Sequence, residues 1–459
     1  MKMYYNVEDK PKFGQLIVFA IQQLLAIMAA TLVVPVIIGN GMSSAAALFG
    51  AGVGTLVYVL FTAKKSPVFL GSSFAFIGSM FAAFAGGVSM SLGYVGLILG
   101  AVFAGIVYVI IAIIVKFAGV GWINKLMPPV VIGPTVAIIG LSLAGNAVGD
   151  LQKGGVLDAK GNSVANVLLC VLIGIITLIV TMLCSTYGKK TAKLIPFILG
   201  ILAGYAVALI FTVIGNAADI EALKLINFGN FTALVSGGIT LETFVSLPDF
   251  TFLTAFGGLK ELNASYVGTI AVAYVPVAFV VFAEHIADHK NISSIIEKDL
   301  LEEPGLHRTL LGDGVGSMVG AFFGGCPNTT YGESVACVAI TRNASVATII
   351  AAALGAIIVS FVNPFVAFVN SIPSCVMGGV CMALYGFIAV SGLKMVQKVD
   401  LNENRNLFVV SAILIAGIGG LSLTFGKITL TAVATSLILG IIVNLILSGK
   451  KADENETEE

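Results

Sequence analysis

The chain has 459 residues, of which 58% are apolar and only 10% are charged. Soluble domains carry about a quarter charged residues, so this composition excludes a soluble globular protein and indicates a polytopic membrane protein. The formal net charge of +0 argues against a nucleic-acid-binding protein, which needs a clustered surplus of Lys and Arg. The six cysteines show no C-x-x-C spacing, so we predict neither a disulfide framework nor a zinc site.

Apolar segments recur along the whole chain, and we interpret each of them as a membrane span. They cover residues 16–39, 45–62, 67–85, 91–115, 128–148, 164–184, 194–215, 266–288, 309–325, 327–341, 345–370, 373–393, 406–422 and 429–448. The polar interval between the seventh and eighth spans divides the fourteen into seven and seven. Because each half contains an odd number of spans, we expect the second half to be inverted relative to the first.

This division predicts four regions: a first repeat at 1–215, an extracellular connecting segment at 216–265, a second repeat at 266–448 and an acidic cytoplasmic tail at 449–459. The basic residues support it. If the N-terminus is cytoplasmic, only five of the 24 Lys and Arg residues, at positions 153, 160, 224, 260 and 427, lie outside. This asymmetry follows the positive-inside rule and predicts a multi-pass protein of the cell membrane with both termini in the cytoplasm.

The third span of each half is irregular. In the first half it reads Pro67-Val-Phe-Leu-Gly-Ser-Ser-Phe-Ala-Phe76, and in the second Pro327-Asn-Thr-Thr-Tyr-Gly-Glu333. The irregular span of the second half is shorter than the roughly 20 residues that a membrane helix needs. Backbone that is not helical is tolerated at membrane depth only where it is buried in protein or lines a cavity. We therefore expect two broken helices that meet at a substrate site, with Phe74 facing Tyr331. The alternatives are an ordinary loop before a short helix and, for Phe74, a plain core or lipid-facing aromatic.

The eighth span carries Glu284 and Asp288, which share one helix face because they are four residues apart. A carboxylate at the bilayer centre costs about 2.5–3.5 kcal/mol, so such residues are functional by default. Glu284 and Glu333 are the strongest candidates for a binding site. Asp288 and Asp313 lie nearer to span ends, where hydration is the competing explanation. When the cavity is sealed, Glu284 and Asp288 could share a single proton, since ionising the second acid beside the first is unfavourable.

His285 and His289 are also four residues apart, which is a spacing found in metal sites. A zinc-protease helix requires H-E-x-x-H, and here Ile286 follows the first histidine. We therefore predict no metal at this position. His289 precedes Lys290 at the expected cytoplasmic boundary, so we expect it to be solvated.

Several motifs resemble the bacterial uracil permeases of the nucleobase/ascorbate transporter family, also called the uracil/xanthine permease family, and the similarity extends over residues 12–448. The segments that carry it are Leu70-Gly-Ser-Ser-Phe-Ala-Phe76, Ala283-Glu-His285, Lys298-Asp-Leu-Leu301, Pro304-Gly-Leu-His-Arg308, Pro327-Asn-Thr-Thr-Tyr-Gly-Glu333, Ala339-Ile-Thr-Arg342 and Leu384-Tyr-Gly386. The resemblance implies an all-α polytopic fold of fourteen spans in two inverted repeats, with short antiparallel strands in spans 3 and 10. It also implies a core domain (spans 1–4 and 8–11) that moves against a gate domain (spans 5–7 and 12–14).

The same resemblance implies a transporter and not an enzyme, without a cofactor, that takes up a nucleobase by alternating access in symport with protons, often as a homodimer in the lipid membrane. Glu284 and Glu333 would then bind the base through hydrogen bonds. The backbone at Phe74 and Gly332 would contact it, and Tyr331 and Tyr385 would lie near it. Proton coupling would fall to Glu284 and Asp288.

This chain departs from the pattern of these uracil permeases at several positions. Asp288 and Gln23 each replace a histidine, and Ser334-Val335-Ala336 replaces the Asn-x-Gly that usually follows the second glutamate. Asp288 and Asp313 are more similar to the xanthine-transporting branch, so xanthine remains the alternative substrate to uracil. Two carboxylates match the two NH donors of a neutral imide and would repel an anion such as sulfate, bicarbonate or ascorbate. A channel would need a polar pore and a hydrolase a nucleophilic dyad, and neither pattern is present in the sequence.

Overall fold

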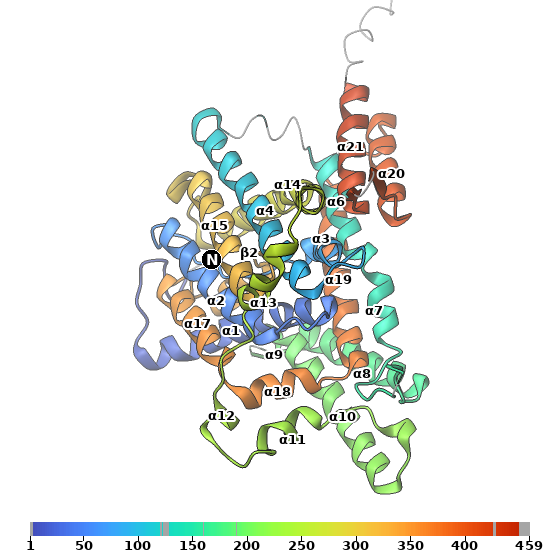
Figure 1. Ribbon diagram of the computed structural model, residues 1–459. Helices are drawn as coiled ribbons and strands as arrows, with labels where there is room; N and C mark the ends of the chain where they lie inside the picture. Colours follow the sequence, from blue (N-terminus) through green and yellow to red (C-terminus); the bar gives the residue numbers. More distant parts are fainter. Residues whose placement is uncertain are drawn as a thin grey trace, which may run out of the picture.

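The computed structural model describes residues 3–119, 122, 128–158, 160–189, 191–425 and 428–448, which are mostly helical (Figure 1). The predicted acidic tail at 449–459 lies outside the described residues. So do six of the basic residues used in the topology prediction, namely Lys2, Lys125, Lys190, Lys427, Lys450 and Lys451.

Among the described residues, eight helices are long and apolar enough to cross a membrane, as judged by length and composition. They are α1 (Phe13–Ile38), α2 (Ser44–Phe61), α4 (Met90–Ala118), α6 (Pro129–Ser142) continued by α7 (Ala144–Asp150), α8 (Val167–Tyr187), α10 (Pro196–Ala218), α14 (Ala264–Ile296) and α19 (Ser374–Val396). The remaining predicted spans contain α3 (Ile77–Ala83), α15 (Leu306–Gly324), α16 (Gly332–Thr341), α17 (Val346–Ser360), α20 (Asn404–Ile418) and α21 (Ala432–Ser448). Each predicted span therefore contains a helix, which confirms the polytopic all-α class.

The helices form two groups that lie side by side in Figure 1. In the first, α2 packs against α15 and α17, α4 packs against α14 and α15, and α1 packs against α17. In the second, α6 packs against α19 and α20, α8 packs against α10, and α20 packs against α21. These groups contain spans 1–4 with 8–11 and spans 5–7 with 12–14, which confirms the predicted core and gate.

Glycines allow the closest helix contact of the core. A Cβ atom on Gly50 of α2 would lie 2.3 Å from the carbonyl oxygen of Gly320 in α15, and one on Gly54 would lie 2.7 Å from that of Gly316. Both distances are far below van der Waals contact, so only glycine fits. Small residues of this kind drive helix association in membranes, where a hydrophobic driving force between helices is lacking. The pair α2 and α15 therefore forms a rigid support behind the broken spans.

The two broken spans cross through a short antiparallel ladder, as predicted. Strand β1 (Leu70–Ser72) pairs with β2 (Asn328–Thr330), so that Leu70 lies opposite Thr330 and Ser72 opposite Asn328. Each strand leads into a half-helix: β1 into the 3₁₀ turn η1 (Phe74–Phe76) and α3, and β2 into α16. A second ladder, which the sequence did not predict, joins β3 (Leu423–Phe425) to β4 (Ile428–Leu430) between α20 and α21.

The polar interval 216–265 contains short elements that the sequence did not predict. These are η2 (Glu221–Leu223), α11 (Gly229–Val235), α12 (Leu241–Phe244), α13 (Thr251–Gly258) and η3 (Leu259–Glu261). Helix α18 (Asn363–Ser371) packs against α11 and α12, and α13 packs against α4. The other short elements are α9 (Thr191–Leu194) and η4 (Leu301–Gly305). The limits of the two repeats, 1–215 and 266–448, stay predictions.

Candidate functional site

A cavity of about 440 Å³ lies between the core and the gate. This volume falls within the roughly 300–1,000 Å³ that is typical of small-molecule sites. The core contributes Ala26, Phe74, Ala75, Glu284, Ala287, Asp288, Thr329, Thr330, Tyr331, Gly332, Glu333, Ala336, Cys337 and Ile340. The gate contributes mainly apolar side chains, among them Val136, Ile139, Phe197, Leu384, Phe387 and Ile388, together with Ser391.

The N-termini of both half-helices border this cavity. Helix α16 begins at Gly332 after Tyr331, whose backbone is extended (φ −106°, ψ 123°) and whose side chain does not cap the helix. Turn η1 likewise begins at Phe74 without a side-chain cap. The first NH groups of a helix have no acceptor within it, and the helix dipole adds partial positive charge there. The cavity therefore offers backbone donors to the carbonyl oxygens of a ligand.

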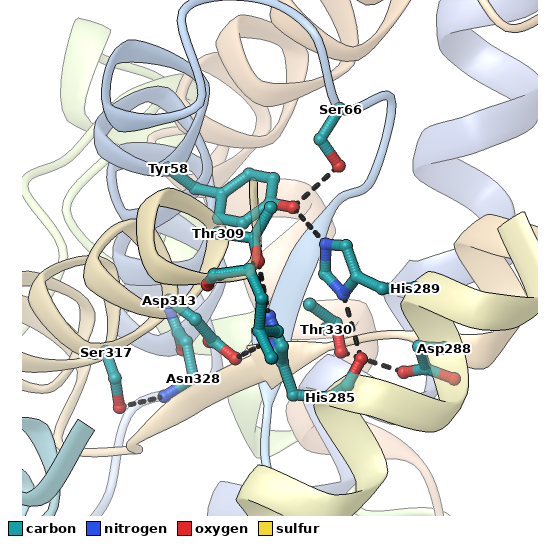
Figure 2. Close-up of polar contacts among 11 residues, drawn as sticks. Tyr58, Ser66, His285, Asp288, His289, Thr309, Asp313, Ser317, Asn328 and Thr330 are labelled. Carbon is teal, nitrogen blue, oxygen red and sulfur yellow. Dashed lines mark hydrogen bonds and ion pairs between the residues drawn. The ribbon is translucent and has the colours of Figure 1, made fainter. Parts of the chain in front are cut away.

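Three carboxylates face the same space from two elements. Glu284 and Asp288 lie one turn apart on α14, and Glu333 lies in the first turn of α16. All three are partly buried, and Thr330 of β2 donates a hydrogen bond of 2.8 Å from Oγ1 to Asp288 Oδ2 (Figure 2). These carboxylates supply acceptors for ligand NH groups on the side of the cavity opposite to the apolar gate.

Two aromatic residues border the cavity at the crossing. The ring of Phe74 does not pair with Tyr331 but meets the gate residue Tyr385 edge to face, with centroids 6.1 Å apart. Tyr331 is held by its hydroxyl, which donates a hydrogen bond of 2.6 Å to the carbonyl oxygen of Ser72. Six of the seven predicted site residues therefore line one cavity, and the seventh, Tyr385, lies behind Phe74 without lining it.

A second face of α14, about 100° around the helix axis from the acids, carries a buried polar cluster (Figure 2). Nδ1 of His285 lies 2.7 Å from Asp313 Oδ2, and Nε2 of His289 lies 2.7 Å from the hydroxyl of Tyr58, which in turn contacts Ser66 at 2.6 Å. The rings of His285 and His289 stack with centroids 4.0 Å apart.

This cluster corrects two expectations. His289 is fully buried, not solvated, and Asp313 is only 1% exposed, not a hydrated span end. His289 is buried because α14 continues to Ile296, eight residues beyond the predicted span, so that the interior of the core extends past Lys290. Asp313 is buried because α15 directs it at His285 inside the core. Within the described part of the chain, no group of three or more His, Cys, Asp or Glu side chains is arranged to hold a metal ion.

The sequence did not point to the gate residues of the cavity. Phe197, Phe387 and Ile388 are ordinary apolar residues of α10 and α19, and no pattern separates them from lipid-facing neighbours. Lys193 of α9 also lines the cavity; its position between the sixth and seventh predicted spans was the available signal. Thr330, in contrast, lies inside the polar stretch that suggested the site.

Comparison with known proteins identifies relatives over the whole length of the chain. The model of the Permease family, that of the xanthine/uracil permeases, matches residues 14–426. The uracil permease of Bacillus caldolyticus is 38% identical, with 100% of this chain and 98% of the relative covered. The uracil permease of Bacillus subtilis (strain 168) is 36% identical with the same coverage. That of Escherichia coli (strain K12) is 36% identical, with 96% of this chain and 93% of the relative covered.

Solved structures share the fold at much lower identity. The transmembrane domain of the cyanobacterial bicarbonate transporter BicA superposes with a TM-score of 0.63 at 14% identity, covering 95% of this chain and 99% of that domain. The murine anion transporter Slc26a9 in its inward-facing state gives a TM-score of 0.62 at 11% identity, covering 96% of this chain and 69% of that protein. At this level of identity the likeness concerns the fold alone.

Proposed function

Because the chain belongs to the xanthine/uracil permease family and is therefore a multi-pass membrane transporter and not an enzyme, we propose that it imports a nucleobase in symport with protons by alternating access. Uracil is the first candidate, since relatives with up to 38% identity over the full chain are named uracil permeases. Import across the cell membrane with both termini in the cytoplasm follows the predicted topology.

The observation that carries the proposal is the pairing of acceptors and donors in one cavity. Glu284 and Glu333 offer carboxylate oxygens to the two ring NH groups of uracil, and the half-helix N-termini at Phe74 and Gly332 offer NH groups to its carbonyl oxygens. Phe74 adds an aromatic face against which a planar base can stack. A buried polar group left unpaired costs about 1–3 kcal/mol, so this pattern also discriminates between bases.

Xanthine is the second candidate, and the cavity gives a specific reason for it. A volume of about 440 Å³ accommodates a purine as well as a pyrimidine, and Asp288 adds a third carboxylate where the similar uracil permeases have a histidine. Xanthine has more ring NH donors than uracil and could use that additional acceptor.

The lining also suggests which side of the membrane the cavity serves. It continues to Ser185, Lys193, Ile340 and Met395, near the ends of α8, α9, α16 and α19 that the predicted topology places in the cytoplasm. We therefore assign the conformation to the inward-facing half of the transport cycle. Movement of the core against the apolar gate would close this side.

Uptake of radiolabelled uracil and xanthine into vesicles that contain the purified protein tests the proposal. Uracil should accumulate when the outside is made acidic, and a protonophore should abolish accumulation but leave exchange of internal for external uracil intact. Preferential accumulation of xanthine would establish the second candidate. Absence of uptake for both bases in protein that is folded would reject the proposed function.

A further inference from the structure

Behind Glu333 lies a hydrogen-bonded junction that the proposed mechanism does not use. Ser334, the next residue of α16, is completely buried. Its Oγ accepts a hydrogen bond of 3.0 Å from the backbone NH of Phe69, just before β1, and a second one from Nε2 of Gln23 in α1. Gln23 is itself only 2% exposed. One hydroxyl thus joins three segments of the core that are far apart in the sequence.

The hydrogen-bond geometry leaves this hydroxyl little freedom. A serine oxygen has two lone pairs, and the NH groups of Phe69 and Gln23 occupy both. Because the site is buried, losing either donor would leave a polar group without water to replace it, which makes the arrangement costly to disturb. Ser334 is therefore held in one orientation by α1 on one side and by the first broken span on the other.

This constraint acts on Glu333 through the helix. Consecutive residues of an α-helix are separated by about 100° around its axis, so a side chain fixed toward the rear of α16 fixes the direction of its neighbour. Helix α16 has only ten residues and begins at an uncapped N-terminus, and it has no preceding helical turn that would otherwise restrict its rotation. Glu333, directly before Ser334, is thereby turned toward the cavity that it lines.

The geometry points to Gln23 and Ser334 as a pair of positioning residues that set the direction of the Glu333 carboxylate and so determine how strictly the site requires a ring NH in its substrate. This inference rests on the proposed function, since it assumes that Glu333 accepts a hydrogen bond from the base. Both residues are among the positions at which this chain departs from the uracil permeases that it resembles.

The test measures substrate discrimination in the purified full-length protein. Dissociation constants for uracil and for its 1-methyl and 3-methyl derivatives would be determined for wild type, Gln23→Met, Ser334→Ala and the double variant. The discrimination ratio is the dissociation constant of the methyl derivative that wild type binds more weakly, divided by that of uracil. Each single substitution should reduce this ratio about tenfold, the effect of one hydrogen bond to a charged group. The double variant should lose no more than the single variants, because both act through one junction.

Thr177→Val is the matched control. Thr177 is also a fully buried hydroxyl, but its Oγ1 donates only to the carbonyl oxygen of Ile173 within α8, away from the cavity. Its discrimination ratio should equal that of wild type even if its thermal stability falls. Ser334→Thr, which keeps the hydroxyl, should also retain the ratio. Should Ser334→Ala fail to fold, Gln23→Met carries the same expectation alone.

Two results would overturn the inference. One is an unchanged discrimination ratio in Gln23→Met and Ser334→Ala with only thermal stability reduced, which would make the junction purely structural. The other is a double variant whose loss equals the product of the single losses, which would mean independent effects. If wild type itself binds neither uracil nor xanthine, the proposed function has failed instead.

Discussion

Substituting Ala for Gly71 tests whether the crossing of the two broken spans supports the cavity. A Cβ atom at this position would lie 2.4 Å and 2.5 Å from Cε2 and Cζ of Tyr331 and 2.9 Å from Oγ1 of Thr31. Favourable contacts between heavy atoms lie at about 3.5–4.0 Å, so the ring of Tyr331 has to move away by about 1 Å. Tyr331 is buried and cannot move without disturbing its neighbours.

The magnitude follows from two contributions. Overpacking a well-packed interior by one methyl group costs about 1–3 kcal/mol. Displacing the ring also weakens the hydrogen bond of 2.6 Å from the Tyr331 hydroxyl to the carbonyl oxygen of Ser72. Loss of such a bond costs about 0.5–1.5 kcal/mol. We expect Gly71→Ala to lower the free energy of unfolding by about 2–4 kcal/mol and to weaken binding of uracil, because Tyr331 and Gly332 line the cavity.

Reversible unfolding in mixed micelles of sodium dodecyl sulfate, followed by far-UV circular dichroism, measures the stability, and equilibrium binding measures the affinity. Gly78→Ala is the control, since a Cβ there meets nothing within 4 Å in α3. In a helix interior Ala is more favourable than Gly by about 0.5–1 kcal/mol, so this variant should be at least as stable as wild type. If Gly71→Ala matched Gly78→Ala in stability and affinity, the crossing would not be the support described above.

Four further substitutions test the roles proposed for the cavity. Glu284→Gln and Glu333→Gln should each abolish uptake while the protein still inserts, because each removes an acceptor for a base NH. Phe74→Ala should weaken affinity by about tenfold or more, since stacking on an aromatic is worth about 1–3 kcal/mol per base. Asp288→Asn should retain binding and exchange but lose accumulation driven by a pH gradient, because an amide cannot carry the proton.

Exposed positions provide the controls for these variants. Glu302→Gln alters an exposed carboxylate away from the cavity, and Phe81→Ala removes an aromatic that is 37% exposed on α3. Both should transport like wild type. Uptake at the wild-type rate in either glutamine variant would remove that residue from the site, and unchanged affinity in Phe74→Ala would remove the stacking role. If the Asp288→Asn variant still accumulated substrate, the proton-coupling role would be reassigned to Glu284 or Glu333.

The spans were accessible from the sequence because membrane insertion imposes simple constraints, whereas the division into core and gate followed from the family resemblance. Apolar length, a polar division between halves and the asymmetry of Lys and Arg are each read directly from composition. The end of α14 was not accessible, because Lys290 marks the end of hydrophobicity but not the end of the helix, which continues to Ile296. The ladder of β3 and β4 lies between two spans, and its strands of three residues are too short for a periodic pattern to predict them.

The polar half of the candidate site was accessible for a related reason. A carboxylate within a span is costly, so Glu284 and Glu333 stand out in any apolar sequence. The gate half was not, since Phe387 and Ile388 differ from lipid-facing residues only by the direction in which α19 turns them. The contact between Gln23 and Ser334 spans 311 positions and depends on the crossing of the broken spans. Only the three-dimensional structure brings these residues together.

The sequence Glu284-His-Ile-Ala-Asp288-His shows why each polar residue has to be placed on a face of its helix before a functional role is assigned to it. It contains two pairs with a spacing of four residues, offset by one position, so a helix directs the acids and the histidines about 100° apart. The acids line the cavity. The histidines pack into the core and find their partners in Asp313 and Tyr58. The contacts of His285 with α15 and of His289 with α2 hold the rotation of α14 about its axis, and this rotation directs both acids at the cavity.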